Sequence, residues 1–192
     1  MNGLFHVLSL ALFSIWVYYI NMIDRTLIDN FTLLAKDFAT KWKNMVRKTP
    51  QLNYYNTMDD EALIELNSAF YPILAKAIDR GIDRSVVGNF FVSLGKDRMK
   101  EGFPISEIIY SITFAERVII EYIMTEFAPE SPAKMYQSME VISKISEFCL
   151  LGCFYITKGY LEAVYTKMNA HDSISEEFLK KYFKDDFFFK PE

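Results

Sequence analysis

One helical pattern runs without a break from about Ala133 to Met168. Its apolar residues recur at alternating four- and three-residue steps, the period of a single amphipathic helix. A helix of that length extends ~54 Å at 1.5 Å per residue, which is longer than a small bundle needs. Its heptad-like spacing suits contact with a second copy, so we predict a homodimer through this helix. The residues of the predicted stripe are Met135, Met139, Ile142, Cys149, Cys153, Ile156, Tyr160 and Ala163.

Helical spacing also covers the rest of the chain from Thr26 onward, and no strand pattern is present. Only 7 glycines and 6 prolines interrupt the 192 residues, which favours long helices. The predicted fold is an all-α helical bundle of about five main helices in residues 24–170, with a hydrophobic helix before it (1–23) and a short amphipathic tail after it (171–192). Helix ends are predicted before Pro50 and at Gly81 and Gly102, helix starts at Thr57, Asp83 and Pro104, and a kink near Tyr71 caused by Pro72.

Two glycine pairs share a seven-residue spacing inside helical patterns: Gly88 with Gly95, and Gly152 with Gly159. Each pair puts two positions without a side chain on one helical face, because seven residues make about two turns. A phosphate-binding glycine would lie in a strand-to-helix loop instead. We therefore expect these glycines to let two helices approach closely.

Residues 1–23 contain no charged side chain and are apolar on all sides. About 20 apolar residues span the hydrocarbon layer of a bilayer, so the segment predicts a transmembrane anchor. From Asp24 to Lys48 the chain carries 6 Lys or Arg against 3 Asp, which predicts an inner-membrane protein with a cytoplasmic C-terminal domain. The alternative is a helix buried in the bundle or in an oligomer interface of a cytoplasmic protein. A cleaved signal peptide fits less well, because a basic start and a small-residue cleavage site are missing.

The tail carries three consecutive aromatic residues, Phe187, Phe188 and Phe189. Such a cluster is not expected to stay in water. Three interpretations remain open: the aromatic residues dock back on the bundle, insert at a membrane surface, or fill a groove on a partner protein.

Glu116 lies among isoleucines on the most apolar face of its predicted helix. A buried carboxylate needs a partner or an elevated pKa. We expect an ion pair or polar network with Arg98 or Arg117, with ligand or proton sensing as the functional alternative. A general acid or base would need a second catalytic group, and the sequence offers none.

Cys149 and Cys153 lie one helical turn apart and would close no useful loop as a disulfide. Buried thiols that pack like small apolar side chains are the simplest interpretation. Redox sensing or metal–thiolate binding is the alternative, and either requires exposure or a lowered pKa.

Charge and composition exclude several classes of function. The net charge of −4 gives no electrostatic footprint for nucleic acid. The 2 histidines lie far apart in sequence, so we expect neither a metal site nor a cofactor. No paired carboxylates and no Cys–His or Ser–His arrangement is evident, so we do not expect an enzyme.

The segment LGKDRMKEGFPISEIIYSITFAER combines a glycine, a basic residue, a Gly-Phe turn, a Ser-containing helix start and a later arginine. With the upstream helix that contains Trp42, it resembles the N-terminal domain of the RsbT co-antagonist (RsbR/RsbD-type) family of bacterial signalling proteins. The resemblance spans roughly residues 33–166 and implies an all-helical input module without catalytic residues. The positions that carry it are Gly95, Arg98, Gly102, Phe103, Ser106 and Arg117.

Two functions follow as leading expectations. The first is a non-enzymatic signalling or regulatory module, membrane-tethered and acting through protein–protein contacts. The second is a structural subunit or adaptor of a larger membrane-associated assembly. A helical carrier for an apolar molecule is a third, and it would require a closed apolar pocket of ~300 Å³ or more.

Overall fold

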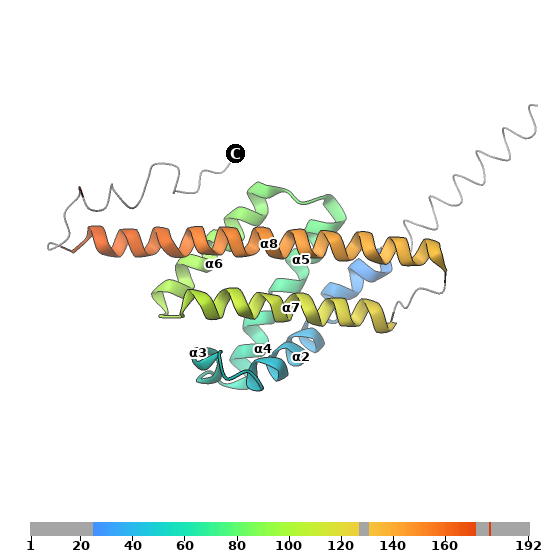
Figure 1. Ribbon diagram of the computed structural model, residues 1–192, viewed down its shortest axis with the longest axis horizontal. Helices are drawn as coiled ribbons and strands as arrows, with labels where there is room; N and C mark the ends of the chain where they lie inside the picture. The colour runs from blue at the N-terminus through green and yellow to red at the C-terminus, as the bar shows by residue number, and fades with distance from the viewer. Residues whose placement is uncertain (1–24, 127–130, 172–176, 178–192) are drawn as a thin grey trace, which may run out of the picture.

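The structure is a computed structural model that describes residues 25–126, 131–171 and 177. These residues form helices and their connections and contain no strand, which confirms the predicted all-α class. The predicted hydrophobic helix (1–23) and the tail aromatics Phe187, Phe188 and Phe189 lie outside the described residues. In the part that is described, no helix is both long enough and apolar enough to cross a membrane. The complete helices are α2 (Ala35–Arg47), α3 (Asn53–Asn56), α4 (Asp60–Ser68), α5 (Phe70–Arg80), α6 (Arg84–Lys100), α7 (Ile105–Glu126) and α8 (Pro132–Asn169) (Figure 1).

The first predicted helix is divided in two. Residues 25–33 are helical, Leu34 forms a turn, and α2 continues to Arg47 before Pro50. Phe38 and Trp42 are buried on the inner side of α2, as their spacing predicts. The Trp42 indole nitrogen donates a 2.8 Å hydrogen bond to the Ser111 carbonyl, which ties α2 to the middle of α7.

The next predicted helix is also divided, and its start differs from the expectation. Asp59, not Thr57, is the N-cap of α4: its carboxylate accepts a hydrogen bond from the Ala62 backbone nitrogen. The helix breaks at Ala69, three residues before Pro72, where the sequence suggested only a kink near Tyr71. Proline has no N–H to donate to the carbonyl four residues earlier, so the break falls one turn before it.

Glycine sets both turns that flank α6. Gly81 has φ 83° and Gly102 has φ 86°, a left-handed conformation that other residues rarely adopt. Asp83 caps the start of α6, since its carboxylate accepts hydrogen bonds from the Ser85 and Val86 backbone nitrogens. The predicted turns between α5, α6 and α7 are thus confirmed.

The long helix is confirmed as α8, whose 38 residues begin at Pro132, directly after the N-cap Ser131. Figure 1 shows α7 and α8 side by side in opposite directions, with α6 crossing α8 behind them and the C-terminal end of α8 extending past both. The predicted stripe of α8 is rotated by roughly a quarter turn from the observed one. Met135 and Met139 are exposed, while the buried side contains Gln137, Val141, Ile145, Phe148, Gly152, Ile156, Gly159 and Glu162.

The rotation follows from the glycines, which bring α6 and α8 into backbone contact. A Cβ added at Gly95 would lie 2.2 Å from the Ile156 carbonyl oxygen, and one added at Gly159 would lie 2.1 Å from the Val92 carbonyl oxygen. Real Cβ atoms do not approach other atoms that closely. The predicted close helix approach is therefore confirmed at Gly95 and Gly159, and the glycine side of α8 must face α6.

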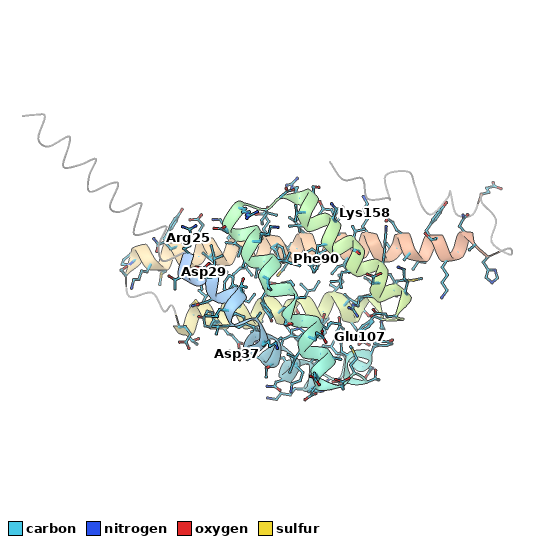
Figure 2. All side chains as sticks on the ribbon, turned by 180° about the vertical axis from the view of Figure 1, so that it is seen from behind. Arg25, Asp29, Asp37, Phe90, Glu107 and Lys158 are labelled. Carbon is cyan, nitrogen blue, oxygen red and sulfur yellow. The ribbon has the colours of Figure 1, made fainter. Side chains whose placement is uncertain are left out.

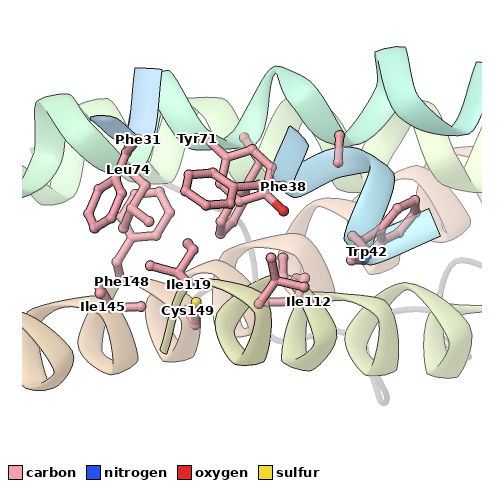
Figure 3. Packing of buried hydrophobic residues seen from close by; sticks show 14 of the residues in the cluster. Phe31, Phe38, Trp42, Tyr71, Leu74, Ile112, Ile119, Ile145, Phe148 and Cys149 are labelled. Atoms are coloured by element: carbon pink, nitrogen blue, oxygen red, sulfur yellow. The ribbon is translucent and has the colours of Figure 1, made fainter. Parts of the chain in front are cut away.

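An aromatic core lies between α8 and the helices from α2 to α7 (Figure 3). Phe38 is at its centre: its ring centroid lies 5.2 Å from that of Tyr71 and 5.0 Å from that of Tyr122. Phe148 of α8 joins this core by packing edge-on against Phe70, with a centroid distance of 5.5 Å. Such tilted contacts place the positive edge of one ring against the negative face of another.

Candidate functional site

Most of the large apolar side chains that the described residues expose lie on α7 and α8. Leu33 and Val86 are exposed elsewhere in the fold, and single exposed residues of this kind are ordinary. A gathered set on two neighbouring helices is typical of an interaction surface. The set consists of Tyr110, Met124, Met135, Tyr136, Met139, Leu150 and Phe154.

Five of these residues form the outer stripe of α8: Met135, Tyr136, Met139, Leu150 and Phe154. Met139 and Leu150 are eleven residues apart, which is about three turns, and Leu150 and Phe154 are about one turn apart. Leu150 is 71% exposed and Phe154 58% exposed, although both belong to the most apolar part of the helix. The outer stripe therefore leaves apolar surface in water along much of α8.

Two side chains of opposite charge lie next to the outer stripe, both on the same side of it. Glu147 is exposed and precedes Leu150, while Lys158 follows Phe154, with its ammonium group 6.0 Å from the Phe154 ring centroid. Glu147 and Lys158 are eleven residues apart and so share one flank of the helix. The opposite flank carries Ser146 and Cys153, which are uncharged.

The predicted polar network of Glu116, Arg98 and Arg117 is not formed. Glu116 is half-buried and accepts a 2.6 Å hydrogen bond from the Ser146 hydroxyl of α8. The Arg98 guanidinium pairs with Glu101 at the end of α6, and Arg117 pairs with Glu121 one turn along α7 at 2.7 Å. Each arginine thus pairs with a carboxylate about one helical turn along the chain, and Glu116 is satisfied by a neutral hydroxyl across the α7–α8 contact.

Cys149 and Cys153 are both free thiols, Cys149 buried and Cys153 half-buried. Burial raises the pKa of both thiols, and the negative charge of Glu116 raises them further. A raised pKa lowers the thiolate fraction at neutral pH, and the thiolate is the reactive form. This environment supports packing over redox chemistry for the pair.

We expect both thiols of the folded protein to react with iodoacetamide at pH 7.4 at least about tenfold more slowly than free cysteine. The reason is the combination of burial and raised pKa at Cys149 and Cys153. Mass spectrometry of timed samples measures each rate, and the same chain in urea gives the reference for accessible thiols. Rapid labelling of Cys153 in the folded state would restore the redox interpretation.

Within the described ranges, no group of three or more His, Cys, Asp or Glu side chains could hold a metal ion.

The chain matches no protein-family model, no curated protein and no solved structure. The resemblance to the RsbT co-antagonist N-terminal domain therefore stays a prediction from sequence.

The outer stripe of α8 was only partly predicted. The predicted apolar stripe included Met135 and Met139, which lie in the outer stripe, but it did not include Leu150 and Phe154. The signal was present in the glycine spacing: once Gly152 and Gly159 are placed against α6, Leu150 and Phe154 must point away from it.

Proposed function

We propose that this chain is a non-enzymatic regulatory module that acts through protein–protein contacts, with the outer stripe of α8 as its contact surface. The observation that carries the proposal is the exposure of Leu150 and Phe154 in the middle of a helix whose opposite side is buried. A long, continuous helix that extends past its bundle also suits the transmission of a change from one end to the other. Membrane tethering through residues 1–23 belongs to the same proposal and rests on their sequence.

The occupant of the outer stripe is a second copy of this chain, packed antiparallel. If the two-fold axis passes near Gly152, Leu150 of one copy lies opposite Phe154 of the other. The same register places Glu147 opposite Lys158 of the second copy, because one is five residues before Gly152 and the other six after. In an antiparallel pair, the flank that carries Glu147 and Lys158 lies against the same flank of the second copy. Glu147 of each copy therefore meets Lys158 of the other.

A parallel pair would lack this complementarity. Parallel helices bring the flank that carries Glu147 and Lys158 against the other flank of the partner, which carries Ser146 and Cys153. The ion pairs between Glu147 and Lys158 of the two copies would then be lost. The charge pattern therefore favours the antiparallel arrangement.

The full chain is expected to be a dimer by size-exclusion chromatography with light scattering, and Phe154→Glu is expected to be a monomer. The introduced carboxylate would lose its hydration in the dimer interface and would compete with Glu147 of the second copy for Lys158. Leu33→Glu is the matched control, because Leu33 is 79% exposed and lies outside the stripe. Circular dichroism checks that each variant keeps its helix content.

A charge exchange tests the register itself. Glu147→Lys alone should weaken the dimer about tenfold by placing two lysines together, and adding Lys158→Glu in the same chain should restore it. A wild-type monomer at all concentrations, or a dimer that ignores these substitutions, would contradict the proposed surface. Co-purification at fixed stoichiometry with other proteins, without self-association, would instead support a subunit of a larger assembly.

A further inference from the structure

A cavity of about 260 Å³ lies inside the bundle, with walls from every helix from α2 to α8. Its inner wall is apolar and buried, and includes Trp42, Phe91, Ala115 and Ile156. Empty spaces in native cores are normally no larger than a water molecule. An apolar cavity of about 150 Å³ is already large enough to hold benzene. This volume therefore suits a small molecule of about ten non-hydrogen atoms.

The cavity reaches the surface where α4 and α6 line it. Phe90, half-buried on α6, lies on the face seen in Figure 2 and lines this outer part together with Leu66 and Leu94. Arg98 and Glu65 also line it and carry its charges. A ligand could thus enter between α4 and α6 and place its apolar part against Phe91 and Ile156.

Asn67 supplies a hydrogen-bonding group inside the cavity. Its side chain lies on α4, where only 7% of the residue is exposed, and its amide oxygen accepts a 2.7 Å hydrogen bond from the Tyr71 hydroxyl. Its amide nitrogen has no hydrogen-bond partner among the described residues. This nitrogen is not fully enclosed by protein, so its N–H groups are available to an occupant that can accept a hydrogen bond.

Arg98 supplies the positive charge. Its side chain is 16% exposed, one of its guanidinium nitrogens pairs with Glu101, and its guanidinium lies 5.0 Å from the Phe103 ring centroid. A guanidinium has five N–H donors, so the ion pair with Glu101 leaves donors for a second anion. Near it, the Tyr55 hydroxyl lies 3.1 Å from the Ser111 hydroxyl, and burial raises the pKa of Tyr55 to about 12, which keeps that phenol neutral.

We propose that this cavity binds a small amphipathic carboxylic acid, with the apolar part among Phe91, Ala115 and Ile156 and the carboxylate toward Arg98 and Asn67. Aromatic and aliphatic walls favour the hydrocarbon part, and the two donors select an anionic acceptor over a neutral or cationic head. This site is separate from the outer stripe of α8, so the proposal does not depend on the dimer.

Octanoate is the test ligand, because its ten non-hydrogen atoms fit the volume, and 1-octanol is its neutral counterpart. Calorimetric titration of the full chain should show saturable binding of octanoate at one site. Octanol should bind about tenfold more weakly, because it makes no ion pair with Arg98. Arg98→Gln should lower the affinity for octanoate about tenfold and leave the affinity for octanol unchanged. Arg98→Lys keeps the positive charge, so it should retain part of the preference for octanoate over octanol.

Ala115→Leu should abolish binding of both ligands by filling the cavity, with Ala170→Leu, at the exposed end of α8, as the matched control. Circular dichroism shows whether Ala115→Leu is folded. If Ala115→Leu does not fold, the comparison of octanoate with octanol and the Arg98 variants test the proposal instead. Absence of saturable octanoate binding, equal affinity for the acid and the alcohol, or binding that survives a folded Ala115→Leu would each overturn the proposal.

Discussion

Replacing Gly159 with alanine is expected to lower the free energy of unfolding by about 3 kcal/mol. The new Cβ would lie 2.1 Å from the Val92 carbonyl oxygen and 2.8 Å from the Val92 Cα, so α6 and α8 must move apart. Alanine favours the helical state by up to about 1 kcal/mol relative to glycine, which offsets only part of this cost. Urea unfolding followed by circular dichroism measures the change.

Gly152→Ala is the matched comparison on the same helix. Its added Cβ would meet the Phe91 ring at 2.8 Å, and a ring can rotate or shift where a backbone carbonyl cannot. We therefore expect a loss smaller by about 1–2 kcal/mol than for Gly159→Ala. Equal losses at the two positions, or a stabilised Gly159→Ala, would show that α6 and α8 do not touch through their backbones.

The glycines also show how far the sequence determines the fold. Glycine spacing, helix caps and reverse turns are local signals, and those at Gly81, Asp83 and Gly102 predicted the helix boundaries correctly. The rotation of α8 is not local. It depends on which neighbour occupies the glycine face, and a stripe chosen by apolar residues alone grouped the exposed Met135 and Met139 with the buried Cys149 and Ile156.

The candidate sites were harder to predict because they depend on contacts between distant residues. Glu116 was recognised as a carboxylate on an apolar face, but its partner Ser146 is 30 residues away and on another helix. No periodic pattern in the sequence indicates the cavity. Its polar residues, such as Asn67 and Arg98, belong to helices that read as ordinary amphipathic segments, and only the packing of seven helices brings them to one space.

The second large effect is expected at Phe38 in the aromatic core. Phe38 is 1% exposed and contacts the rings of Phe31, Tyr71 and Tyr122, which belong to three different segments of the chain. Phe38→Ala removes the ring that joins them and leaves a cavity that the surrounding helices fill only in part. We expect a loss of about 4 kcal/mol in the free energy of unfolding.

Thermal and urea unfolding both measure this loss, with Leu33→Ala as the control. Leu33 is 79% exposed and lies outside the outer stripe, so its truncation should change stability by less than about 0.5 kcal/mol. The Phe38 variant should unfold about 8–16 °C below the wild type. A shift as small as that of the control would mean that α2 does not pack between α5 and α7. The edge-on contacts that join these helices would then not hold the core together.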